Sequence, residues 1–181
     1  MKLPTLFLAL SMLHVFAFEF TSVREEIPES NPVTRQLVTD GRTKFSFIAP
    51  AGWEIRADNS SRKMILQPTT STGGFIVRLS TNSVPASAAL LRSSLADRFQ
   101  NVVILDEFGA ASGSGPGLGI EFLHVANSNV PATTRLAVFG TPEGLVEIAL
   151  TGSARDFEKF RPAWTSFMNS FRVESRTAQR K

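Results

Sequence analysis

From Phe45 onward the chain alternates short apolar runs with turn-forming residues, and this spacing restricts its fold more than any other feature of the sequence. The connections between the runs are short, whereas a parallel pair of strands needs a crossover of about a dozen residues or more. Neighbouring runs should therefore pair as antiparallel strands. The expected strands are Phe45–Ile48, Glu54–Ala57, Lys63–Gln67, Phe75–Thr81, Val102–Gly109, Leu118–Ala126, Thr133–Gly140 and Leu145–Thr151.

Two longer segments, Ala86–Phe99 and Arg155–Phe171, place apolar residues three or four positions apart, which is the spacing of an amphipathic helix. In the second segment Pro162 lacks a backbone N–H, so the helix should either kink there or start its second segment there. Strands such as Val102–Gly109 are apolar on both sides, so both faces of the sheet need cover. The sequence therefore predicts an α+β fold, with an antiparallel β-sheet sandwiched between α-helices as an α/β/α sandwich.

The chain has 181 residues, of which 43% are hydrophobic and 19% are charged, so it is long and apolar enough to form one ordinary domain. That domain is expected to span residues 45–173. Residues 18–44 show no sustained period and indicate a linker or an irregular N-terminal arm. The sequence contains no cysteine, which excludes disulfides, thiol nucleophiles and cysteine-based metal sites.

Residues 1–17 have the pattern of a secretory signal peptide. Met1 and Lys2 form a short positive start, an apolar run follows, and Ala17 provides the small residue at the expected cleavage site. The apolar run is shorter than the roughly 20 residues that a membrane-spanning helix needs. We therefore expect a cleaved, exported protein with a periplasmic, secreted or lumenal location and no transmembrane span.

The sequence pI of about 9.8 is misleading as a guide to partners. Between Phe18 and Phe171 there are 14 Lys and Arg residues against 15 Asp and Glu residues, so the basicity belongs to the C-terminal end. This distribution does not indicate a nucleic-acid partner. The basic tail, residues 174–181, is interpreted as a solvated end, with a weak contact to an anionic membrane surface as the alternative.

Two local motifs resemble the PsbP-like (PsbP/Mog/DcrB) domain family, which includes many exported proteins. The opening strand Phe45–Ile48 runs into Pro50-Ala51-Gly52-Trp53, and Ser170-Phe171-Arg172 follows the second amphipathic segment. The resemblance covers residues 45–173 and implies an antiparallel sheet between helices. It carries over no catalytic residue, because members of the family use the fold as a platform for different partners.

The sequence offers little for catalysis. His124 is the single histidine after the signal peptide, and it shares a strand face with Ile120 and Phe122, as a core histidine does. The glycine-rich run Gly113–Gly119 is followed by a strand and lacks the Lys-Ser or Lys-Thr of a phosphate-binding loop. We therefore expect no catalytic residue, no metal site and no cofactor.

Single charges on otherwise apolar strands are the most informative polar residues. If their strands are neighbours, these charges form either a cross-strand ion network or the lining of a polar pocket. Trp53 has two interpretations, closure of one end of the core or stacking against a ligand. The charges in question are Arg78, Glu121, Arg135 and Glu147, and the candidate ligand-binding residues are Trp53, Arg78, His124 and Arg135.

Three hypotheses about function remain. The leading one is an exported, monomeric, non-enzymatic binding or scaffold module with an unidentified protein partner. The second is a small-ligand-binding or weakly hydrolytic protein with one pocket near Trp53, Arg78, His124 and Arg135. The third is a membrane-surface protein held by the basic tail.

Cleavage after Ala17 gives the first testable prediction. When the full-length chain is expressed in a host that exports it, N-terminal sequencing of the mature protein should begin at Phe18. An N-terminus at Met1 in the exported fraction would contradict the signal-peptide interpretation.

Overall fold

The computed structural model describes residues 18–26, 31–41, 43–85, 87–126, 129–141 and 144–174. The predicted signal peptide and residues 175–181 of the predicted basic tail lie outside these residues. Every strand pairing within the described ranges is antiparallel, as the short connections predicted. The strands form a large sheet and a smaller one.

The large sheet has the strand order β4-β5-β6-β10-β9-β8-β7. It contains the strands predicted from Glu54 onward, several of them longer than expected. A short 3-10 turn, Asn59–Ser61, joins the first two. The bounds are β4 Trp53–Asp58, β5 Lys63–Pro68, β6 Gly74–Ser80, β7 Gln100–Ser112, β8 Gly115–Val125, β9 Pro131–Thr141 and β10 Gly144–Ser153.

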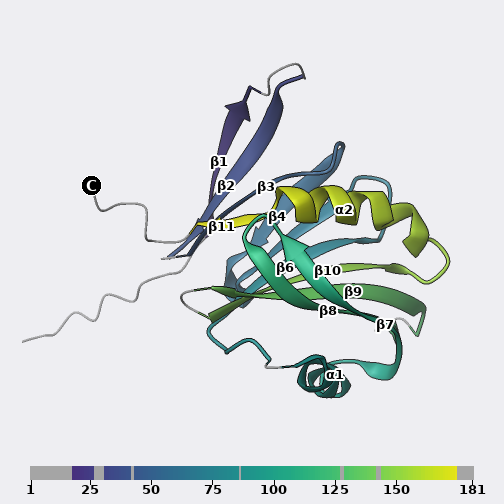
Figure 1. Cartoon of the computed structure of the whole chain (residues 1–181). Coiled ribbons are helices and arrows are strands. Elements are labelled where there is room, and N and C mark those ends of the chain that lie inside the picture. The colour runs from purple at the N-terminus through teal and green to yellow at the C-terminus, as the bar shows by residue number, and fades with distance from the viewer. Residues whose placement is uncertain are drawn as a thin grey trace, which may run out of the picture.

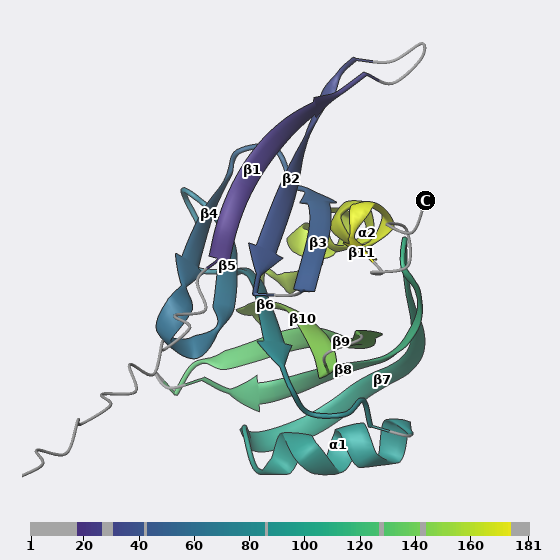
Figure 2. The ribbon, with the colours of Figure 1, turned by 90° about the vertical axis from the view of Figure 1, so that its left-hand side faces the viewer.

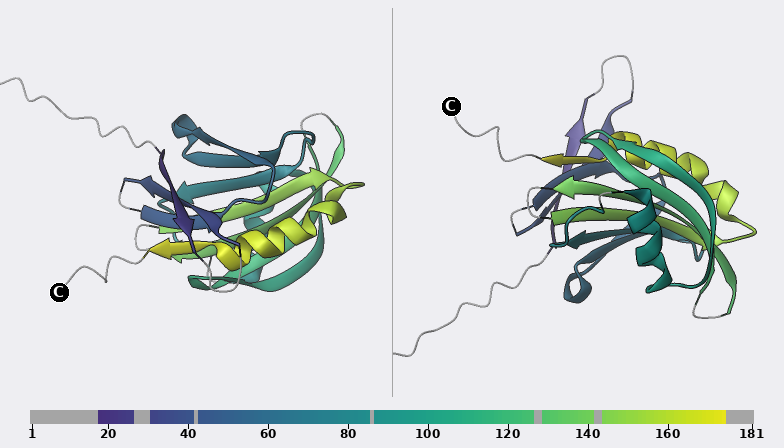
Figure 3. Two further views of the ribbon diagram at one scale, coloured as in Figure 1. Left: turned by 90° about the horizontal axis from the view of Figure 1, so that it is seen from above. Right: turned by 60° about the horizontal axis from the view of Figure 1, so that its bottom comes forward.

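Each face of the large sheet carries one short helix, α1 (Ala88–Ala96) on one side and α2 (Arg161–Ser170) on the other (Figures 1 and 3). A 3-10 turn, Phe157–Phe160, precedes α2, and Pro162 lies in the first turn of α2. Proline therefore starts the second helical segment, where its missing N–H leaves no hydrogen bond unmade. Because both helices are short, the predicted α/β/α sandwich is only partly realised, and strands dominate the fold.

The prediction for residues 18–44 is wrong in its local structure. This region forms β1 (Phe18–Glu25) and β2 (Val33–Asp40), which join β3 (Thr43–Ile48) and β11 (Arg172–Glu174) in a small sheet of order β1-β2-β3-β11. Figure 2 shows β1 and β2 projecting from the body. Apolar and polar residues alternate only over the first four residues of β1, and most of the strand is exposed, so the sequence pattern gave little sign of it. The strand is instead held in place by its hydrogen bonds to β2.

The main core lies between the α2 side of the large sheet, α2 itself and the small sheet. Phe167 of α2 is at its centre, with its ring centroid 4.5 Å from that of Phe75 on β6 and 5.2 Å from that of Phe47 on β3. Val38 of β2 also belongs to this core. The packed domain therefore begins before Phe45, and α2 and the two sheets bury one another.

A second, smaller core lies on the other face of the large sheet. Leu91 and Leu95 of α1 pack onto Ile120 and Phe122 of β8 and onto Leu136 of β9. Their spacing of four residues places both leucines on one side of α1, as the sequence predicted. Because α1 has only nine residues, it covers part of this face, which leaves room for pockets beside it.

Truncation of Phe167 tests the central role of the main core. Phe167→Ala should lower the free energy of unfolding by about 3–5 kcal/mol, because it removes a fully buried ring from the contact between α2 and both sheets. The matched control is Phe20→Ala on the exposed strand β1, with an expected loss below about 1 kcal/mol. Urea unfolding followed by circular dichroism measures both, and equal losses would contradict this account of the core.

Candidate functional site

The four predicted ligand-binding residues do not share one pocket. Trp53 and Arg135 lie on the α2 side of the large sheet, whereas Arg78 and His124 lie on the α1 side. The pleat explains the separation, because successive residues of a strand point to opposite faces. The single predicted pocket is therefore wrong, although Arg78 and His124 line two pockets on the same side.

Trp53 is partly buried and packs against the edge of the main core. Its backbone N–H donates to the Pro50 carbonyl across a turn in which Gly52 takes a positive φ of 76°. Its ring centroid lies 5.3 Å from that of Phe75 and 6.0 Å from that of Phe160. This packing confirms the first interpretation of Trp53, closure of one end of the core.

Arg135 forms an ion cluster on the α2 side. Its guanidinium donates to the buried Glu121 at 2.5 Å, and Arg161 of α2 donates to the same carboxylate at 2.6 Å. Arg135 also stacks 3.7 Å from the ring centroid of Phe108, and this ring fits because position 119 is glycine, where a Cβ would lie 2.2 Å from it. Arg161 pairs in addition with Glu158, and its hydrogen bonds to Glu158 and Glu121 raise its pKa.

Glu147 anchors a separate ion cluster on the α1 side. Arg98, just after α1, donates to both of its carboxylate oxygens, at 2.6 and 2.7 Å. Arg78 stands opposite Glu147 in the register of β6 and β10, with its Nη1 3.8 Å from Oε1. The four charges predicted to form one network or pocket therefore form two pairs on opposite faces, each completed by an arginine that sequence reasoning missed.

A pocket of about 450 Å³ opens beside this second cluster, and we call it the Arg78 pocket. Its base is apolar, from Leu91 of α1, Val138 of β9 and Leu145 of β10. Its polar lining comes from β6, the segment that follows β6, α1 and the residues after α1. These polar residues are Arg78, Ser80, Asn82, Ser83, Ser94 and Arg98, with Glu147 between the two arginines.

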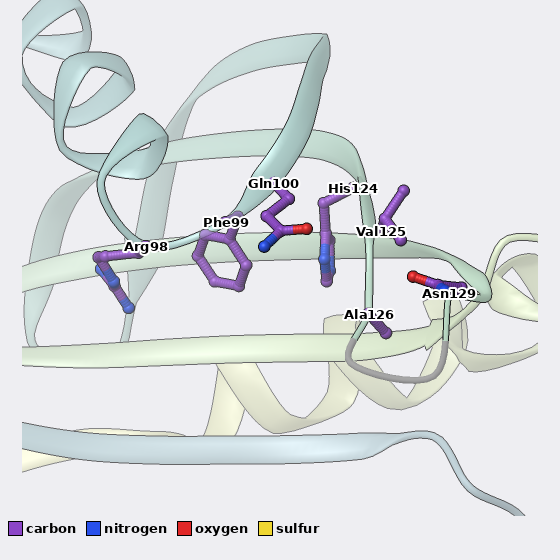
Figure 4. A pocket seen from close by; sticks show the side chains of 7 residues that line it. All are labelled: Arg98, Phe99, Gln100, His124, Val125, Ala126 and Asn129. Carbon is purple, nitrogen blue, oxygen red and sulfur yellow. The ribbon is translucent and has the colours of Figure 1, made fainter.

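Arg98 also borders a neighbouring open pocket of about 760 Å³, the His124 pocket. Figure 4 shows Phe99, Gln100 and His124 in a row, with Arg98 at one end and Asn129 at the other. The guanidinium of Arg98 lies 5.4 Å from the centroid of the Phe99 ring. The two pockets therefore share Arg98 as a lining residue, and both lie on the α1 side of the large sheet.

Neither a protein-family model nor a curated protein sequence matches this chain. Among solved structures, the cyanobacterial PsbP (CyanoP) of Synechocystis sp. PCC 6803 is similar, with a TM-score of 0.55 over 82% of this chain and 98% of that chain at 11% identity. This chain has a PsbP-like fold. LpqN of Mycobacterium tuberculosis, described as involved in cell envelope biogenesis, has a TM-score of 0.50 over 87% of this chain and 92% of that one, also at 11% identity.

On this PsbP-like fold, His124 is a buried residue that is 6% exposed. Its Nε2 lies 3.0 Å from the Thr134 hydroxyl, which lies 2.7 Å from the Thr151 hydroxyl, so a polar chain crosses three strands. Nδ1 makes no hydrogen bond of good geometry. Burial lowers the pKa of His124 below its usual 6.5, and the backbone of Val125 offsets part of this effect.

The described residues contain no group of three or more His, Asp or Glu side chains placed to hold a metal ion. Nor does any helix in the described ranges have the length and apolar character to cross a membrane. The hydroxyl beside His124 belongs to Thr134, which is 2% exposed and is therefore shielded from any substrate.

The lowered pKa of His124 predicts a pH effect on stability. As the pH falls, His124 of the unfolded chain takes up a proton near pH 6.5, whereas His124 of the folded chain does so only at a lower pH. The stability that the neutral, buried imidazole contributes is therefore complete above pH 6.5 and is lost as the pH falls from there through the folded pKa. His124→Gln should remove this part of the pH dependence. The free energy of unfolding, measured in urea from pH 7.5 to 5, should therefore fall less steeply in the variant, and equal slopes would contradict the assignment.

Proposed function

We propose that this chain is an exported, non-enzymatic binding module of PsbP-like fold that holds a ligand in the Arg78 and His124 pockets. The observation that carries the proposal is the convergence of Arg78 and Arg98 beside Glu147 in a pocket with an apolar base. Functional ligand sites commonly combine an apolar base with a few convergent polar groups.

Two observations favour binding over catalysis. A nucleophile must be accessible and activated by a nearby base. Thr134 is the hydroxyl that bonds His124, and it is buried and also bonded to Thr151. The lining of the Arg78 pocket offers hydroxyls from serines, and none of its residues is a histidine that could act as their base.

Export rests on the N-terminal sequence pattern, residues 1–17. The structural similarity to LpqN, a protein involved in cell envelope biogenesis, fits a location outside the cytoplasm. The same similarity supports an accessory or scaffold role, because PsbP-like proteins share the fold rather than a reaction.

A second candidate is the docking of a protein partner along β7. This strand lies at the edge of the large sheet, and its Val103 and Leu105 are 58% and 49% exposed. Exposed apolar residues on a free edge are a common feature of protein contacts. On this candidate the α1-side pockets would be incidental to function.

A thermal-shift screen with a blocked pocket separates these candidates. The screen covers metals, sugars, nucleotides, lipids, small acids and peptidoglycan fragments. It uses the purified protein, a Ser83→Trp variant that places a large ring in the lining of the Arg78 pocket, and a Thr69→Trp variant at an exposed position outside that lining as the control. A ligand of the pocket should raise the melting temperature by roughly several degrees in the original protein and the control, but not in Ser83→Trp.

Two outcomes would contradict pocket binding. One is a ligand that stabilises Ser83→Trp as much as the original protein. The other is a screen without any shift, which would favour the β7 candidate. In that case, capture of a specific partner that is lost in a Val103→Asp/Leu105→Asp variant would support protein docking.

A further inference from the structure

We propose that the Arg78 pocket recognises an anionic head group, a carboxylate or a phosphate, on a small ligand with a short apolar body. This inference rests on the proposed function, since it names the chemistry of the ligand for the same pocket. Three features of the pocket support it: the excess of positive charge, the hydrogen-bond donors of Arg78 that have no acceptor, and the apolar base.

The charge balance favours an anion. Two guanidinium groups, those of Arg78 and Arg98, face one carboxylate, that of Glu147, and the pocket lining contains no other acidic residue. One positive charge is therefore left without a counter-charge in a partly enclosed, half-apolar site. Such a site strengthens an interaction with a bound anion relative to bulk water, because solvent screening is reduced.

Arg78 is the arginine with donors to spare. Arg98 uses two of its nitrogens on Glu147, whereas Arg78 reaches Glu147 at 3.8 Å, which is beyond hydrogen-bonding distance. Among the described residues, no acceptor takes a hydrogen bond from the guanidinium of Arg78. Its planar donor array matches two oxygens of a carboxylate or phosphate.

Neutral polar groups surround this cation. Ser80 and Asn82 lie on one side of the pocket, where the Ser80 hydroxyl accepts a hydrogen bond from the Asn82 backbone at 3.1 Å, and Ser83 follows. These hydroxyl and amide groups are able to donate to further oxygens of a bound head group. Beneath them, Leu91, Val138 and Leu145 provide contacts for the apolar body of the ligand.

The ion cluster on the opposite face provides an internal comparison. There, Arg135 and Arg161 face two carboxylates, Glu121 and Glu158, so the charges balance. Arg135 is further covered by stacking on Phe108. On the α2 side the charges therefore balance, although the buried Arg135 Nε has no hydrogen-bond partner and Arg135 lines a smaller pocket of about 220 Å³. On the α1 side one cation is left over, and this difference in charge is what favours an anion in the Arg78 pocket.

Isothermal titration with benzoate and phenyl phosphate tests the inference, with benzyl alcohol as the neutral analogue and inorganic phosphate as the head group alone. At least one aromatic anion should bind saturably at low salt, more tightly than inorganic phosphate, and benzyl alcohol should not bind detectably. Comparing benzoate with phenyl phosphate shows which head group is preferred.

Three variants make the test specific. Arg78→Gln should weaken binding by about ten- to a hundredfold, because it removes a charge-assisted bidentate contact. Glu147 keeps Arg98 as its ion-pair partner in this variant, so the rest of the cluster should stay in place. Glu147→Gln should instead strengthen binding, because it frees both arginines. Arg56→Gln, an exposed position on β4 outside the pocket, is the matched control and should leave the affinity unchanged.

The inference is overturned if neither anion binds saturably, or if Arg78→Gln binds like the original protein. Its failure is distinguishable from failure of the proposed function. A neutral ligand found in the thermal-shift screen and lost in Ser83→Trp would keep the pocket as a binding site while rejecting an anionic ligand. Retention of every ligand by Ser83→Trp would reject the pocket itself.

Discussion

The structure depends on one constraint, that the large antiparallel sheet must bury both of its faces. Each strand sends alternate residues to opposite sides, so each face needs its own apolar cover. On the α2 side, α2 and the small sheet provide this cover together, through the aromatic contacts around Phe167. On the α1 side, a nine-residue helix covers only part of the sheet, and both pockets lie beside it. Incomplete cover of the α1 side thus leaves room for the two larger pockets, whereas the pocket beside Arg135 and Trp164 on the α2 side is smaller, at about 220 Å³.

The elements that pack by a regular pattern were predictable from the sequence. The strands from Phe45 onward, the two helices and the role of Pro162 agree with apolar spacing and backbone chemistry. Strands β1 and β2 were not predictable in this way, because β1 is mostly exposed and is ordered by its hydrogen bonds to β2. Apolar spacing in a sequence reveals which residues are buried, so a strand that buries few residues cannot be recognised from that spacing.

The candidate site, too, could be predicted only in part from the sequence. Sequence reasoning identified Arg78, Glu147, Glu121 and Arg135 as unusual charges on apolar strands, and all four make ion pairs. It placed them together because the order of strands in the sheet and the face of each residue were unknown. It missed Arg98 and Arg161, which lie at helix ends, where a charged residue is unremarkable in sequence. Their importance comes only from tertiary contact with a glutamate on a distant strand.

The free edge formed by β7 has a consequence for self-association. Its pairing with β8 is interrupted by register shifts between Gln100 and Val103 and between Ile104 and Asp106. Such bulges twist a strand and break the regular row of backbone donors and acceptors that another strand would need for pairing. A second copy of the chain therefore meets a poor template for extending the sheet into a fibril. The irregular edge allows Val103 and Leu105 to remain exposed at a lower risk of aggregation than a flat edge would carry.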